Sequence, residues 1–89
     1  MYVILVYDVD VSRVSKIMKV CRQFLFHIQN SVFEGEITEA NLIKLKLKIE
    51  EIIDKDYDSV IIFEFESLNP KFVHKEVIGV EKRSTDFII

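Results

Sequence analysis

Apolar residues open the chain in an almost unbroken run and then recur at a wider spacing. Residues 2–9 are rich in β-branched and aromatic side chains, which predicts a buried strand. From residue 14 to residue 28 apolar positions recur every three or four residues, as in an amphipathic helix, and Ser12 is expected to cap its N-terminus. The apolar face of this helix comprises Val14, Ile17, Met18, Cys21, Phe24, Leu25 and Ile28.

The middle of the chain predicts two more strands and a second helix. Residues 28–37 alternate between apolar and polar, with a break near their centre. Thr38 is expected to cap a helix whose inner face comprises Leu42, Leu45, Ile49, Ile52 and Ile53. Residues 43–48 alternate as a strand would, but the cap, an acidic first turn and the longer spacing favour a helix. That choice leaves Ile43 and Leu47 on the outer face.

The last third predicts two strands. An acidic turn at 54–58 precedes a strongly apolar segment at 59–66, which ends at 67–70, and residues 77–81 predict a short final strand. The resulting order is β-α-β-β-α-β plus a C-terminal strand. It is the order of an α+β ferredoxin-like sandwich, in which two helices cover one face of an antiparallel sheet. We expect all of residues 1–89 to form this single domain.

The predicted central strands are apolar on both faces. In the first strand Tyr2, Ile4 and Val6 alternate with other apolar residues, and residues 60–65 show the same property. Two helices can cover only one face, and soluble monomers rarely expose so large an apolar surface. We therefore expect a two-fold symmetric homodimer through the open face. The alternative is that the C-terminal segment folds back as the cover.

Composition adds few restrictions. The 89 residues carry 12 Lys and Arg against 15 Asp and Glu, a net charge of −3, and 49% of them are hydrophobic. A single cysteine excludes an intramolecular disulfide and a cysteine-based zinc site within one chain. The sequence lacks both a signal peptide and an apolar run of ~20 residues, so we expect a soluble cytoplasmic protein without membrane contact.

The distribution of charge is more informative than its sum. No acidic residue lies between Asp10 and Glu34. The predicted first helix carries four basic residues in this interval, namely Arg13, Lys16, Lys19 and Arg22. A dimer would present two such sets to a phosphate backbone. The alternative is an ordinary solvated helix face. The lysines within 44–48 and the acids within 54–58 are interpreted as solvated surface.

Asp8 is the most informative carboxylate, because it ends the first strand directly after Tyr7. One carboxylate cannot hold a metal by itself, but a two-fold axis nearby would bring two copies of Asp8 together. Paired carboxylates suit Mg²⁺ or Mn²⁺, which can activate water against a phosphodiester. The alternative is a plain turn residue. His27 and His74 have no obvious acidic partner in the sequence and are expected to be surface or structural residues.

Three features considered together resemble a known family. Tyr7-Asp8-Val9 ends the first strand, Arg13 opens the basic helix, and Gln-Asn-Ser-Val-Phe-Glu-Gly occupies residues 29–35. In these motifs the chain resembles the Cas-two family, the small CRISPR-associated proteins of spacer acquisition. The resemblance extends through residues 37–40, 58–62 and 77–82.

The resemblance implies a homodimer in which residues 77–89 extend the partner's sheet. It also implies a metal-dependent endonuclease acting on single-stranded RNA or duplex DNA, and partnership with the Cas-one integrase. The metal-binding and catalytic aspartate maps onto Asp8. The other matching positions are Tyr7, also expected to be catalytic, and Arg13, Ser31 and Phe33. Ser31, Phe33 and His27 are expected to support the site. His27 stands where many members have arginine, and histidine is only partly charged near neutral pH.

Three functions therefore stay open. The chain is a Mg²⁺-dependent endonuclease, a non-catalytic adaptor that positions nucleic acid for the Cas-one integrase, or a small-ligand regulatory module on the same fold. The third is disfavoured because no glycine-rich loop is available to hold a ligand. We favour adaptor as the biological role and nuclease as the accompanying activity.

Overall fold

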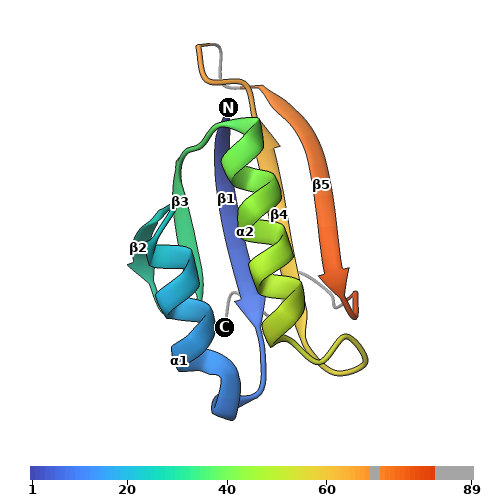
Figure 1. Cartoon of the computed structure of the whole chain (residues 1–89). Helices are drawn as coiled ribbons and strands as arrows, with labels where there is room; N and C mark the ends of the chain where they lie inside the picture. Colours follow the sequence, from blue (N-terminus) through green and yellow to red (C-terminus); the bar gives the residue numbers. More distant parts are fainter. Residues whose placement is uncertain (69–70, 82–89) are drawn as a thin grey trace.

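The sheet is the organising element of the structure, a computed structural model that describes residues 1–68 and 71–81. Within these residues five antiparallel strands form one sheet in the order β2-β3-β1-β4-β5, and both helices cover the same face (Figure 1). The elements are β1 (Tyr2–Asp8), α1 (Val11–Arg22), β2 (Phe26–Gln29), β3 (Val32–Glu36), α2 (Glu39–Ile52), β4 (Ser59–Phe65) and β5 (Phe72–Gly79). The predicted α+β ferredoxin-like order is confirmed.

Helix α1 begins and ends earlier than its apolar spacing predicts. Asp10 is the N-cap, since its carboxylate accepts hydrogen bonds from the Ser12 backbone N–H at 3.0 Å and from the Ser12 hydroxyl at 2.5 Å. The expected cap, Ser12, is therefore the donor. The helix ends at Arg22, and the chain turns sharply, with the Leu25 N–H bonded to the Cys21 carbonyl. Leu25 still packs into the core, which explains why the helical spacing continued past the end of the helix.

The second helix agrees with the sequence more closely. Thr38 caps α2, its hydroxyl accepting the Asn41 backbone N–H at 3.1 Å. Its inner residues are buried, whereas Ile43 is 54% and Leu47 57% exposed. The expected break between β2 and β3 is a turn in which Asn30 has a positive φ of 42°.

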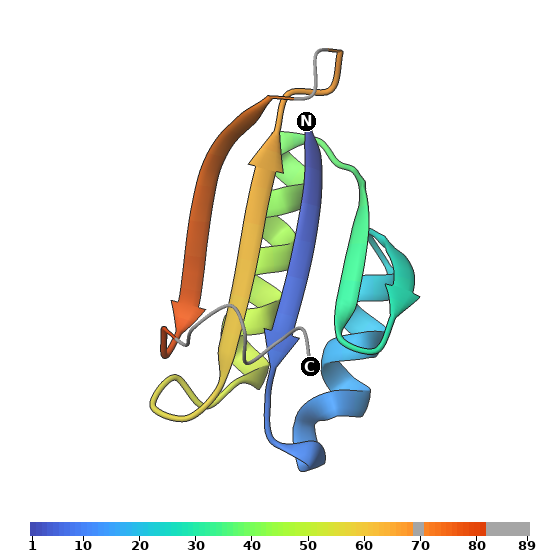
Figure 2. The ribbon, with the colours of Figure 1, turned by 180° about the vertical axis from the view of Figure 1, so that it is seen from behind.

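The two faces of the sheet differ in burial, because both helices pack against the same face. Val3, Leu5 and Tyr7 of β1 point toward the helices and are buried, as is Cys21 of α1, whose pKa is raised by burial to about 12. Alternate residues lie on the far face, seen in Figure 2, where they are half-buried. Tyr2 is paired there with Phe65, and Ile4 with Phe63.

The final strand is longer than predicted. It begins at Phe72 rather than near residue 77, because its polar central residues hide the strand pattern, and it pairs with β4 along its length. Residues 77–79 thus belong to the sheet of their own chain, while residues 82–89, most of the segment expected to extend a partner's sheet, lie outside the described residues. Gly79 closes the strand at φ 89°, where a Cβ would lie 2.2 Å from the Asp58 carbonyl oxygen.

No described helix has the length and apolar character needed to cross a membrane.

Candidate functional site at the end of strand β1

A groove of about 550 Å³ opens where β1 ends, between α1 and the β2–β3 turn. It brings together four residues that the sequence predicted as catalytic or supporting, namely Tyr7, Asp8, His27 and Ser31. The complete lining is Tyr7, Asp8, Val9, Val14, Met18, His27, Asn30 and Ser31. Its polar side chains are those of Tyr7, Asp8, His27, Asn30 and Ser31.

Asp8 is half-buried and occupies the last position of β1. In the ladder it lies opposite Ser59, the first residue of β4. Ser59 is fully buried, and its hydroxyl has no hydrogen-bond partner among the residues that the structure describes. Directly opposed residues share one face of a sheet, so Asp8 and Ser59 lie on the same face, but Ser59 is not part of the groove lining.

Tyr7 fixes the backbone beside Asp8. Its N–H donates to the Ser31 carbonyl at 3.1 Å, which ties the end of β1 to the β2–β3 turn. Tyr7 is 5% exposed, and its ring centroid lies 6.3 Å from that of Phe33. Burial raises the pKa of the phenol, so Tyr7 stays protonated at neutral pH.

His27 forms the opposite wall of the groove. Its ring stacks on Phe33 with centroids 4.7 Å apart, and its Nε2 lies 2.8 Å from the Asn30 carbonyl oxygen. That distance fits an Nε2–H tautomer donating to the carbonyl. Phe33 itself is fully buried, so its role is to support His27 rather than to touch a ligand.

The four cations of the basic segment do not share one environment. Lys16, Lys19 and Arg22 are exposed on α1. Arg13 instead turns inward to Asp58, with Nε 2.5 Å from Oδ2 and Nη2 3.1 Å from Oδ1. The structure therefore gives Arg13 a bidentate ion pair in addition to any contact with nucleic acid.

Asp58 is the centre of what we term the Asp58 corner, formed by Asp58, Arg13 and the backbone of Asp10 and Asp54. The carboxylate is fully buried and accepts both backbone N–H groups at 2.9 Å. Burial by itself would raise the pKa of Asp58, but the hydrogen bonds from Arg13 and the two N–H groups outweigh it and lower the pKa. The interpretation of this acid as solvated surface was wrong. Its position directly before an apolar strand was the available signal.

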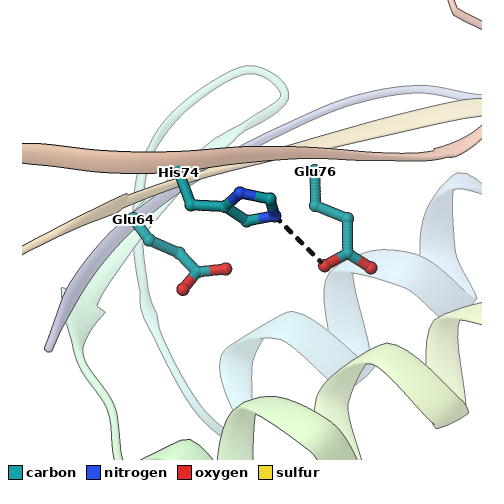
Figure 3. Close-up of side chains that lie close together, drawn as sticks. All are labelled: Glu64, His74 and Glu76. Atoms are coloured by element: carbon teal, nitrogen blue, oxygen red, sulfur yellow. Dashed lines mark ion pairs between the residues drawn. The ribbon is translucent and has the colours of Figure 1, made fainter.

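A second cluster, which we term the edge cluster, comprises Glu64, His74 and Glu76 near the edge strand β5. Figure 3 shows the three side chains projecting from neighbouring strands to the same side. His74 thus has acidic neighbours, contrary to its sequence interpretation, because Glu64 lies opposite it in the ladder and Glu76 follows two residues later. Lys46 of α2 reaches this cluster and is not a purely solvated lysine.

The chain is similar to known proteins over most of its length. Residues 1–69 match the family model described as CRISPR associated protein Cas2. The chain belongs to the Cas2 family. The resemblance to the Cas-two family, which is this Cas2 family, is thereby confirmed.

Two relatives of this Cas2 chain are similar over its whole length. One, from Methanocaldococcus jannaschii, is 52% identical over 90 residues, covering 100% of this chain and 76% of the relative. The other, from Thermococcus kodakarensis, is 51% identical and covers 100% of both chains. Each is named CRISPR-associated endoribonuclease Cas2.

Solved Cas2 structures agree with the fold. The crystal structure of Streptococcus pyogenes Cas2 at pH 6.5 is 30% identical, with a TM-score of 0.69 over 74% of this chain and 87% of that one. A structure described as the crystal structure of cas2 is 50% identical, with a TM-score of 0.66 over 70% of each chain.

Proposed function

We propose that this Cas2 protein is a Mg²⁺-dependent endoribonuclease that cleaves at the groove where β1 ends. The observation that carries the proposal is the position of Asp8, a half-buried carboxylate at the strand end, lining a groove with Tyr7, His27 and Ser31. The relatives' printed names supply the substrate class, RNA. Duplex DNA is the alternative substrate, because both polymers present the same phosphodiester.

The groove's donor atoms fit a magnesium ion. Mg²⁺ takes oxygen ligands, often only one or two carboxylates, and keeps several waters. Asp8 supplies a carboxylate to the groove and Ser31 lines it too, whereas Ser59, opposite Asp8 in the ladder, is fully buried and is not part of the lining. The ion would be held by Asp8; Mn²⁺ has the same ligand preference.

A second copy of the chain would complete this site. Strand alternation places Asp8 on the same face as Tyr2, Ile4 and Val6, which are half-buried. A two-fold homodimer that covers this apolar face, with its axis near the end of β1, would also bring the two Asp8 carboxylates together.

The residues of the chain have different proposed roles in cleavage. Bound magnesium supplies a more acidic water and neutralises phosphate charge. Asp8 holds the ion, and Tyr7 orients Asp8 through the backbone bond to Ser31. His27 lies at the wall, where its protonated form adds positive charge beside a phosphate. Lys16, Lys19 and Arg22 bind flanking phosphates, while Arg13 acts as a positioning residue because it anchors the β1–α1 connection to Asp58.

A nucleic-acid adaptor in spacer acquisition, partnered with the Cas-one integrase, is the second candidate function. One observation favours it: Lys16, Lys19 and Arg22 are exposed on α1 yet do not line the groove. The helix can therefore hold a phosphate backbone without delivering it to Asp8. We propose that both functions use the same dimer.

Asp8→Asn tests the enzymatic proposal, with Asp56→Asn as the matched control in the exposed α2–β4 turn. We expect Asp8→Asn to slow Mg²⁺-dependent cleavage of single-stranded RNA by at least about 100-fold, because a catalytic metal is worth several kcal/mol. The dimer, measured by sedimentation, should persist. Asp56→Asn should cleave normally.

Equal cleavage by both variants would contradict the proposal. Measured in cells, spacer acquisition that survives Asp8→Asn would show that the adaptor role needs no cleavage. Loss of acquisition with an intact dimer would instead tie the biological role to Asp8.

A further inference from the structure

Three possible metal ligands converge at the edge cluster. Glu64 of β4 is directly opposite His74 of β5, and Glu76 lies two residues further along β5 on the same side. Residues placed in this way on neighbouring strands are within side-chain reach of one another. One ligand atom from each of the three side chains lies within 4.8 Å of the other two (Figure 3).

The carboxylates of the edge cluster already contact one positively charged side chain, that of Lys46. Lys46 Nζ lies 2.6 Å from Glu76 Oε1 and 3.8 Å from Glu64 Oε2. Two carboxylates thus face one ammonium, so with neutral His74 the group carries a charge of −1. A divalent ion in place of the ammonium would bring the charge to zero.

The imidazole of His74 is positioned beside these carboxylates without a strong bond to them. Its Nε2 lies 3.9 Å from Glu76 Oε1, which is too long for a hydrogen bond. The side chain is 55% exposed, so solvent and ions can reach the ring. Imidazole combined with carboxylate oxygens is a donor set that suits zinc and its neighbours among the transition metals, whereas magnesium prefers oxygen alone.

We propose that Glu64, His74 and Glu76 bind a divalent transition metal ion of the Zn²⁺ class, with Lys46 as the cation that the metal displaces. Three protein ligands leave a fourth tetrahedral position for water. Zinc bonds of ~2.0–2.2 Å put neighbouring ligand atoms ~3.4 Å apart, so the side chains must move closer than they now lie. Their partial exposure permits rotation, and the flexible stem of Lys46 lets its ammonium withdraw to solvent.

The bound ion would fasten the edge strand β5 to β4. It shares no residue with the groove at Asp8, and its ligand chemistry differs from that of the proposed magnesium site. The two proposals therefore stand or fall separately.

Zinc titration of the full-length, tag-free protein tests the proposal. The protein is stripped with EDTA, dialysed into excess Mg²⁺ and titrated with Zn²⁺ in a calorimeter. We expect one zinc per chain. His74→Ala should weaken binding by more than about 10-fold, since even groups that only orient a metal ligand are worth 10–100-fold. Lys46→Met should tighten it, because the competing ammonium is gone.

Three controls assign the binding to the edge cluster. His27→Gln removes the other histidine and should leave zinc affinity unchanged, as should Asp8→Asn. Co²⁺ in place of zinc should give the intense visible absorption of a tetrahedral site in the wild type and lose it in His74→Ala. Glu76→Gln keeps the side chain's size and should also weaken binding, with circular dichroism checking that each variant is folded.

Lack of zinc binding by the wild type would overturn the proposal. Equal affinities of the wild type and His74→Ala would do the same, as would weaker binding by Lys46→Met. Retention of zinc by Asp8→Asn, whatever its cleavage activity, keeps this result independent of the proposed nuclease.

Discussion

Asp58 and Glu76 each bind a basic side chain, but their surroundings give those contacts different meanings. The Asp58 carboxylate is fully buried and bonded to Arg13 and two backbone N–H groups. In the edge cluster, the Glu76 side chain is 38% exposed and shares a single ammonium with Glu64. The first contact joins two connections of the fold, whereas the second leaves one carboxylate charge uncompensated.

The comparison separates a structural ion pair from an exchangeable one. Removing one partner of a buried pair leaves a desolvated charge, which costs several kcal/mol. Around a partly exposed pair, water replaces the lost partner at lower cost. We therefore expect substitutions in the Asp58 corner to affect stability and those in the edge cluster to affect ion binding.

Asp58→Ala should have the largest effect. It removes the acceptor for Arg13 and for the N–H groups of Asp10 and Asp54, so we expect the free energy of unfolding to fall by about 3–5 kcal/mol. Urea unfolding followed by circular dichroism measures the change. Asp56→Ala, in the same turn but exposed, should change it by less than about 0.5 kcal/mol. Similar losses of unfolding free energy in Asp58→Ala and Asp56→Ala would show that the Asp58 corner is not a special structural contact.

Lowering the pH should have the second-largest effect, by weakening the Asp58 corner. The pKa of Asp58 is lowered from 3.8 in the folded chain, so its contribution to stability is present above that value and lost as pH falls through the folded pKa. We expect the stability difference between the wild type and Asp58→Asn to shrink as pH falls from about 6 to about 2. Urea midpoints at each pH measure it. A constant difference would show that the charge of Asp58 is not what stabilises the corner.

Lys46→Met should have the smallest effect on stability. The Lys46 side chain is 19% exposed and its stem can pack without its charge, so we expect a change of at most about 1 kcal/mol in zinc-free buffer. The same urea assay measures it. A loss as large as that of Asp58→Ala would make the edge cluster a structural centre and would contradict an exchangeable cation.

The sequence predicted elements wherever burial produced a regular pattern. Residues 2–8 and the inner face of α2 follow such patterns, and Thr38 is a cap that acts within its own segment. The beginning of β5 was missed because its middle residues are polar, so only pairing with β4 reveals the strand. Local patterns report which face is buried but not which strand lies opposite.

The residues of the candidate site also divide into those that a local pattern identifies and those that only the folded structure identifies. Asp8 and Tyr7 could be identified because they end an apolar strand, and the groove brings both beside His27 and Ser31. Asp58 could not be distinguished from Asp54 and Asp56 by spacing, since all three acids alternate within one turn. The position of Asp58 directly before the apolar strand β4 was a partial signal, and its ion pair with Arg13, 45 residues away in sequence, marks it as the buried one.

The buried thiol of Cys21 gives the molecule a built-in reporter. Its side chain is fully buried on the inner face of α1, and its pKa, raised by burial to about 12, keeps almost all of it as the unreactive thiol. A thiol-specific dye should therefore label the folded chain only when this part of the core opens. Labelling rates in the variants would measure how often α1 separates from the sheet, a motion that equilibrium melting curves average away.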